Sequence, residues 1–204
     1  MREIAVLCTA FASAFLTVWM SVRYCKMIRD GTAEPRLTTW IIFEIGVVMS
    51  LVAYCTSREH NLVENINNVA DSVTVTAILV TLLIKHRQGG GIHFNNREWW
   101  ALRVAMAAFV LWALIRVPWV GVAGFQFVMI VAYLPMLDRL WPERKKSPEP
   151  FGNWAMSATA SAIACCTALI SGNRLAVIYP LRSALFCIFV LWLIKRIEHK
   201  SKHV

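Results

Sequence analysis

The sequence predicts an all-α, polytopic membrane protein with seven transmembrane helices, arranged as two three-helix repeats joined by a linker helix. Composition is the first observation, because 58% of the residues are hydrophobic and only 16% are charged, against about 25% charged in a typical soluble domain. The second is that apolar runs of helical length alternate with short charged segments. The third is a repeated stretch, since RDGTAEPRLTTW at 29–40 returns in outline as RKKSPEPFGNW at 144–154.

Seven apolar runs supply the expected helices. They cover residues 4–22, 37–55, 69–84, 99–116, 118–137, 153–170 and 176–194. Each is ~15 to 20 residues long, which at ~1.5 Å per residue is enough or nearly enough to cross a ~30 Å hydrocarbon core. We expect the first run to be a retained helix, because it continues through Trp19. The third is short and is expected to begin earlier, with Asn67 and Asn68 inside it. Pro118 separates the fourth run from the fifth.

The basic residues are distributed unevenly between the two sides of such a bundle. Fifteen of the 21 Lys and Arg residues fall in loops one, three and five and the C-terminal tail, and only Arg2, Arg58, Arg116 and Arg174 fall on the other side. Cytoplasmic loops carry this excess in membrane proteins, so the N-terminus is expected outside and the C-terminus in the cytoplasm. The net charge of +9 is therefore assigned to contact with anionic lipid headgroups and not to nucleic acid.

The repeated stretch divides the chain into four parts. Residues 1–87 form the first three-helix bundle, 88–117 the linker and helix four, 118–197 the second three-helix bundle, and 198–204 a basic cytoplasmic tail. A single linking helix gives the two bundles the same orientation, and the segments LLIKHR at 82–87 and WLIKRI at 192–197 end them alike. Parallel repeats of this kind place a binding site between the halves near the membrane midplane.

This pattern resembles the PQ-loop superfamily, which includes the SWEET sugar transporters, and most closely its uncharacterised prokaryotic members. The shared elements are a basic loop, a Pro and a Trp once per half, with a further Pro and a Tyr-Pro in the second half. Here they are Pro35 with Trp40, Pro150 with Trp154, Pro135, and Tyr179-Pro180. The resemblance implies transport by alternating access in a prokaryotic cytoplasmic membrane, with Pro35, Pro135 and Pro150 as hinges.

The chain departs from that family at positions that bear on the substrate. The dipeptide that names the family is replaced by Pro35-Arg36 and Pro150-Phe151, and the first helix has no Pro. Where the sugar carriers place Asn on the third helix of each repeat, this chain has Asp71 and Arg182. A pocket for a neutral sugar therefore cannot be transferred from the resemblance.

Asp71 and Arg182 are the strongest candidates for a binding site. They lie 14 residues before Lys85 and 13 residues before Lys195, which places them ~21 Å and ~20 Å above the cytoplasmic edge. A single unpaired charge at such a depth costs at least ~2.5 kcal/mol, so opposite charges at one level indicate an ion pair or a shared wet cavity. One interpretation is that they line a pocket where a polar or zwitterionic solute replaces the partner charge. The other is a structural pair, or two side chains that snorkel outward.

Five further residues complete the predicted pocket. Glu44 lies near the midplane and is a candidate for proton coupling, the alternative being a neutral acid bonded to a neighbouring helix. Asn67 and Asn68 are expected on the pocket wall, with Trp40 and Trp154 packed below it. The two tryptophans also fall at expected membrane boundaries, where indole rings serve as anchors.

The function expected from these features is movement of a small polar solute across the membrane. The five histidines lie in loops or the tail, and no GxSxG, HExxH or phosphate-binding loop is present, so no enzyme, cofactor or metal site is expected. Two alternatives stay open, namely a receptor or sensor that binds a ligand without transporting it, and a membrane-embedded subunit or effector that acts through its basic cytoplasmic face. The oligomeric state is also open, and it includes a homo-oligomer.

Overall fold

Seven helices, and no strand, make up the part of the chain that the structure describes. The computed structural model describes residues 1–89, 96–134, 136–137 and 149–201. The helices are α1 (Arg2–Arg29), α2 (Leu37–Cys55), α3 (Ile66–Gly89), α4 (Asn96–Ile115), α5 (Pro118–Ala132), α7 (Phe151–Ser171) and α8 (Arg174–Ser201). Six of these seven are long and apolar enough to cross a membrane, and α5 is a shorter apolar helix of 15 residues. The prediction of an all-helical membrane fold is therefore confirmed.

The helix ends follow from local sequence. Arg116 takes a left-handed φ of 52°, and Pro118 at the first position of α5 has a fixed φ that suits a helix start. The predicted break between the fourth and fifth helices is thus confirmed. The third helix begins at Ile66, so Asn67 and Asn68 lie in its first turn as expected. Gly172, with a φ of 76°, ends α7 in the left-handed conformation that glycine adopts most easily.

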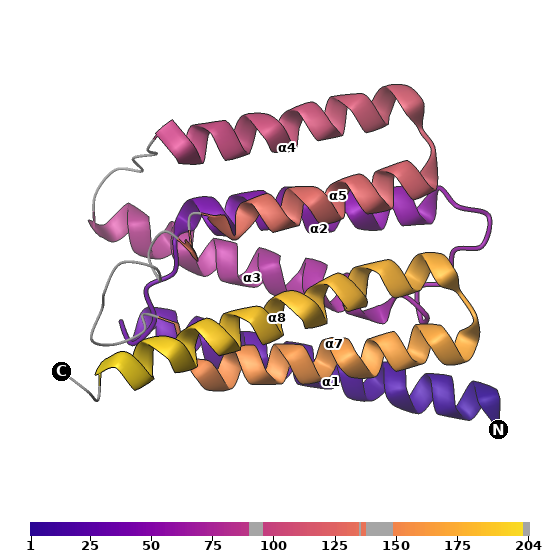
Figure 1. Ribbon diagram of the computed structural model, residues 1–204, viewed down its shortest axis with the longest axis horizontal. Helices are drawn as coiled ribbons and strands as arrows, with labels where there is room; N and C mark the ends of the chain where they lie inside the picture. Colours follow the sequence, from indigo (N-terminus) through magenta and orange to yellow (C-terminus); the bar gives the residue numbers. More distant parts are fainter. Residues whose placement is uncertain (90–95, 135, 138–148, 202–204) are drawn as a thin grey trace.

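The helices run side by side along one direction, with the N-terminus at one end of the bundle and the C-terminus at the other (Figure 1). We call these the N-end, where α1 begins, and the C-end, where α8 ends. Helix α3 packs against both α1 and α2, and α8 packs against both α5 and α7. The group of α1, α2 and α3 meets the group of α5, α7 and α8 where α1 contacts α7 and α2 contacts α5. Helix α4 makes its main contacts with α2 and α5. Helix α4 therefore lies outside the packed six helices.

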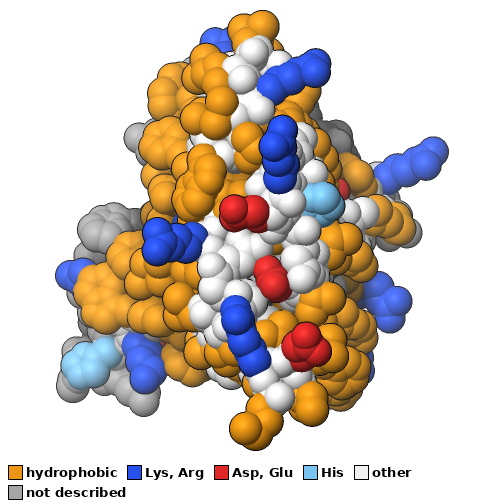
Figure 2. All heavy atoms as spheres, turned by 90° about the vertical axis from the view of Figure 1, so that its right-hand side faces the viewer, with side chains coloured by type: hydrophobic (Ala, Val, Ile, Leu, Met, Phe, Trp, Pro, Cys, Tyr) orange, Lys and Arg blue, Asp and Glu red, His pale blue; other side chains and the backbone are white. Residues whose placement is uncertain are grey.

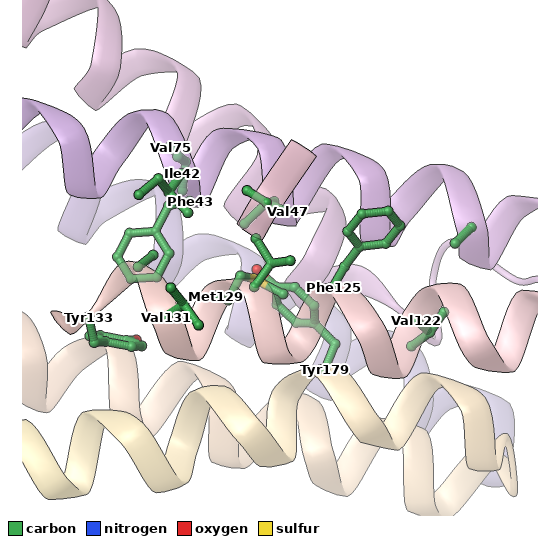
Figure 3. Packing of buried hydrophobic residues seen from close by; sticks show 14 of the residues in the cluster. Ile42, Phe43, Val47, Val75, Val122, Phe125, Met129, Val131, Tyr133 and Tyr179 are labelled. Atoms are coloured by element: carbon green, nitrogen blue, oxygen red, sulfur yellow. The ribbon is translucent and has the colours of Figure 1, made fainter. Parts of the chain in front are cut away.

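Close approach of α2 and α5 depends on small residues. A Cβ placed on Gly46 of α2 would lie 2.6 Å from Met129 Cγ of α5, and one on Gly121 of α5 would overlap the Trp112 indole of α4. Glycine therefore lets these helices come closer than any other residue would allow. The interior that results is built largely from α2 and α5 side chains, with contributions from α3 and α8 (Figure 3).

Apolar residues also cover the outside of the bundle. Phe11, Phe15, Leu114 and Leu185 are among the large apolar side chains that are more than half exposed. A soluble protein would leave few such residues uncovered, whereas a lipid-facing surface requires them. Charged and other polar side chains lie across the middle of the N-end, with apolar side chains on both sides of them (Figure 2).

Candidate functional site

A cavity of about 70 Å³ lies inside the bundle, with walls from α1, α2, α3, α5, α7 and α8. A water molecule occupies ~30 Å³ in the liquid, so the space suits a few waters or part of a small solute. Most of the wall is apolar and aromatic. The polar or charged side chains on it are Asp71, Thr74, Asn153, Ser157, Arg182 and Ser183, together with the tyrosines Tyr24, Tyr133 and Tyr179.

Asp71 is held in the cavity wall by two neutral donors. The Asn67 Nδ2 group, one turn earlier on α3, donates to Asp71 Oδ2 at 3.0 Å. The Tyr179 hydroxyl of α8 donates to the same oxygen, also at 3.0 Å. Hydrogen bonds to an ionised acceptor are stronger than those between neutral groups. Both donors bond Oδ2, which leaves Oδ1 for another partner.

Arg182 is held by a different set of neighbours. Its Nε donates to Gln126 Oε1 of α5 at 3.0 Å, and Nη2 lies 3.4 Å from the Met129 sulfur. The guanidinium carbon also lies 5.1 Å from the centre of the Tyr179 ring, within the range of a cation–π interaction. Arg182 is therefore fixed without a carboxylate partner.

The two charges share the cavity but do not pair directly. Within the described chain, no ion pair within 4.0 Å joins Asp71 to Arg182. Tyr179 lies between them, because its hydroxyl bonds Asp71 while its ring contacts Arg182. Of the two arrangements predicted for opposite charges at one depth, the structure has the shared cavity and not the direct ion pair.

A second polar network links four helices beside the cavity. Gln126 Nε2 donates to Ser50 Oγ at 3.0 Å, and the Ser50 hydroxyl and the Asn68 amide lie 3.3 Å apart. The chain Arg182–Gln126–Ser50–Asn68 thus joins α8, α5, α2 and α3. Gln126 was not among the predicted site residues. It is the single polar side chain in the apolar run of α5, and that isolation is the signal that could have identified it.

Aromatic rings form the C-end side of the cavity. The ring centres of Trp40 and Phe43 are 5.7 Å apart. Those of Phe43 and Tyr133, both labelled in Figure 3, are 4.8 Å apart in an edge-to-face arrangement. Tyr133 in turn lies 6.1 Å from the Trp154 ring. These spacings are typical of favourable aromatic pairs. Trp40 and Trp154 line the cavity, and their predicted contact with a solute stays a prediction.

Hydrogen bonds join neighbouring helices toward each end of the cavity. At the N-end, Asn173 Nδ2 donates to Tyr54 Oη at 3.0 Å and to Glu64 Oε2 at 2.7 Å. We call Tyr54, Glu64 and Asn173 the N-end contact. At the C-end, Glu149 Oε2 accepts from Tyr24 Oη at 2.8 Å and from Trp154 Nε1 at 3.3 Å. We call Tyr24, Glu149 and Trp154 the C-end contact.

Glu44 does not line the cavity. Its Oε1 accepts a hydrogen bond of 2.8 Å from the Thr76 hydroxyl of α3, while Oε2 is buried without a partner among the described residues. Arg103, an exposed residue of α4, lines a shallow hollow with Asn96, Trp99 and Trp100. The acid therefore bonds a neighbouring helix, and its role in proton coupling stays a prediction.

Two of the three predicted proline hinges, Pro35 and Pro150, lie at helix starts. Pro35 is buried just before the N-cap of α2, and Pro150 is itself the N-cap of α7. Pro135 lies outside the described residues. Positions at the ends of helices can absorb a change of backbone angle without breaking helical hydrogen bonds, so hinge function at Pro35 and Pro150 stays a prediction.

No family model matches this chain, and no curated protein or solved structure shows detectable similarity to it. Across the described residues, no group of three or more His, Cys, Asp and Glu side chains could hold a metal ion.

Proposed function

We propose that this protein moves a small polar solute across a membrane by alternating access between two parallel three-helix repeats. In this proposal α1, α2 and α3 form one repeat, α5, α7 and α8 form the other, and α4 links them. The single observation that carries the proposal is that a charged cavity lies between the two groups, with a hydrogen-bonded contact toward each end that joins one group to the other.

The helix contacts support a two-fold relation between the repeats. The third helix of each group packs against the other two, as α3 does with α1 and α2, and as α8 does with α5 and α7. Exchanging each helix for its counterpart converts the α1–α7 contact into the α5–α2 contact, and both contacts are present. Parallel repeats related by an axis along the membrane normal have this property, and they place a solute site at the interface.

In the proposed cycle the two ends of the bundle open one at a time. Breaking the N-end contact while the C-end contact stays closed exposes the cavity to one side of the membrane, and the reverse exposes it to the other. The hydrogen bonds described for each contact have a net worth of ~0.5 to 3 kcal/mol each, depending on charge. A solute that bonds Asp71 and Arg182 can therefore shift the balance between the two states by the difference between its binding free energies in them.

The orientation follows from the basic loops. The excess of Lys and Arg belongs to the loops at the C-end, among them exposed Arg29, Arg36 and Arg87. The C-end is accordingly assigned to the cytoplasm and the N-end to the outside. The resemblance to prokaryotic PQ-loop proteins is the basis for assigning the protein to a prokaryotic cytoplasmic membrane.

Uptake into proteoliposomes tests the proposal. Vesicles containing the purified protein are loaded with one unlabelled metabolite and presented with the same compound labelled, across a panel of sugars and amino acids. We expect at least one compound to exchange faster than in empty vesicles. Arg182→Gln should reduce that exchange by about 10- to 100-fold, because a hydrogen bond from a charged group contributes ~1.5 to 3 kcal/mol.

Arg103→Gln is the matched control, because Arg103 is an arginine in a membrane helix that does not line the cavity. It should exchange solute at the wild-type rate. Equal loss in both variants would refute the assignment of the cavity as the transport site. Binding of a compound with no exchange would refute transport and favour a receptor.

A further inference from the structure

The C-end half of the cavity contains a polar side chain that no described residue bonds. Asn153, in the first turn of α7, is only 3% exposed and lines the cavity. Its Oδ1 and Nδ2 atoms are both buried and without a hydrogen-bond partner among the described residues. A buried polar atom that is left unbonded has lost its hydrogen bonds to water without replacing them, so a side-chain amide with neither atom bonded is unfavourable unless something else bonds it.

The same half of the cavity provides few polar partners for Asn153. Trp154 and Trp40 line the wall beside it. Ser157, one turn further along α7, is bonded to Cys187 of α8, with 3.3 Å between Oγ and Sγ. The amide can act as donor and acceptor at once, so its complement is a neutral group with the same double character.

Helix geometry gives the separation between Asn153 and the charged half of the cavity. The Ser157–Cys187 bond places those two residues at one level. Asn153 lies four residues from Ser157, or ~6 Å toward the C-end, and Arg182 lies five residues from Cys187, or ~7.5 Å toward the N-end. The backbones of Asn153 and Arg182 are thus separated by ~13 Å along the bundle. This separation joins the two backbones and includes the side chains, so it sets the scale of the solute: a tail of about six bonds is ~7 Å long when extended, with a hydrogen bond of ~3 Å at each end.

The charged half of the cavity favours a solute without net charge. Asp71 and Arg182 bring one charge of each sign, and neither is neutralised by direct pairing. A lone cation would meet Arg182, and a lone anion would meet Asp71, each as an unfavourable like charge in a low-dielectric site. A molecule with an ammonium and a carboxylate close together can bond Asp71 through the first and Arg182 through the second.

We infer that the solute is a zwitterion of the amino-acid type, whose neutral tail of about six bonds ends in an amide or urea group bound by Asn153. This inference rests on the proposed function, since it describes the solute of the same cavity. Asn153 is the specificity-determining residue, because it distinguishes a tail that forms hydrogen bonds from an apolar tail of equal length. The aromatic side chains between the two ends contact the apolar part of the tail.

Calorimetric binding to the full-length protein in lipid nanodiscs tests the inference with three probes. Citrulline has a tail of this length with a urea end, 2-aminooctanoate has an apolar tail of equal length, and glucose has no charge. We expect citrulline to bind about tenfold or more tightly than 2-aminooctanoate, and glucose not to bind. Equal affinity for the first two, binding of glucose alone, or no binding by a folded wild-type protein would each overturn the inference.

Asn153→Leu should abolish the preference for citrulline while the affinity for 2-aminooctanoate stays within about threefold of wild type. Asn153→Ser serves if the leucine variant does not fold, and Thr159→Val, at an exposed site on the same helix whose hydroxyl bonds its own backbone, is the control. Retention of the full preference in a folded Asn153 variant would overturn the inference. The proteoliposome exchange assay distinguishes this inference from the proposed function. Citrulline binding without exchange supports the inference and refutes transport. Exchange of glucose alone supports transport and overturns the inference.

Discussion

Asn173 has two separate roles, and substitution can distinguish them. Its Oδ1 accepts the Ala176 backbone N–H at 3.1 Å and so caps α8. Its Nδ2 makes the N-end contact with Tyr54 and Glu64, and also donates to the Glu59 carbonyl at 3.1 Å. Asn173→Ala removes both roles. Asn173→Ser keeps a good cap, because serine is among the preferred N-cap residues, but its shorter side chain cannot reach across to the α2–α3 loop.

The expected loss of stability follows from the bonds that each substitution removes. Loss of the cap costs ~1 kcal/mol. The N-end contact includes a hydrogen bond to a carboxylate, and its loss costs ~1.5 to 3 kcal/mol. Asn173→Ser should therefore destabilise the protein by about 1.5 to 3 kcal/mol, and Asn173→Ala by about 1 kcal/mol more. For a chain of this length each kcal/mol lowers Tm by ~2 to 4 °C, so the serine variant should melt roughly 3 to 12 °C below wild type.

Thermal unfolding of the purified protein measures these shifts, and a cavity cysteine measures their effect on access. Val47→Cys introduces a thiol on the cavity wall, in a protein whose native cysteines are replaced by serine or alanine. In membrane vesicles with the N-end outward, an impermeant thiol reagent should label it faster when Asn173→Ser is added. A serine variant that melts with wild type and labels at the wild-type rate would refute the role of the N-end contact in closing the cavity.

Three further predictions test other parts of the structure. Tyr179→Phe removes the hydroxyl bond to the cavity carboxylate but keeps the ring. Solute affinity should fall by about tenfold in titration calorimetry, and Tm by roughly 3 to 12 °C in thermal unfolding, because a hydrogen bond to a carboxylate is lost. Gly121→Ala places a methyl group on the Trp112 indole and should lower the free energy of unfolding by ~1 to 3 kcal/mol. Gly124→Ala is the control, because a Cβ there has nothing within 4 Å. Equal Tm values for the two variants would contradict the close packing. Glu149→Ala removes the acceptor shared by a tyrosine and a tryptophan at the C-end, so the Val47→Cys thiol should be labelled faster from that side of inverted vesicles.

The sequence by itself determined the seven apolar helices and their order, but not where each one ends. Helices α1 and α8 continue to Arg29 and Ser201, past the expected ends at 22 and 194, because hydropathy marks only the apolar part of a helix. Hydropathy and helical length depend on neighbouring residues along one chain, so the runs, the break at Pro118 and the early start of the third helix were all legible. Asp71 and Arg182 could also be identified, because a charge inside an apolar run is costly wherever the run packs.

Tertiary structure alone decided which side chains meet. Glu44 and Asp71 are both acids within apolar runs of the sequence, yet of these two only Asp71 lines the cavity. The roles of Gln126 and Asn153 depend on which helices lie opposite them, as with the bond from Arg182 to Gln126. Tyr179 lies between Asp71 and Arg182, so these two do not form a simple ion pair. The physical reason is that a helix presents side chains in all directions, and its rotation about its own axis is set by the close packing of its neighbours, such as α5 against Gly46.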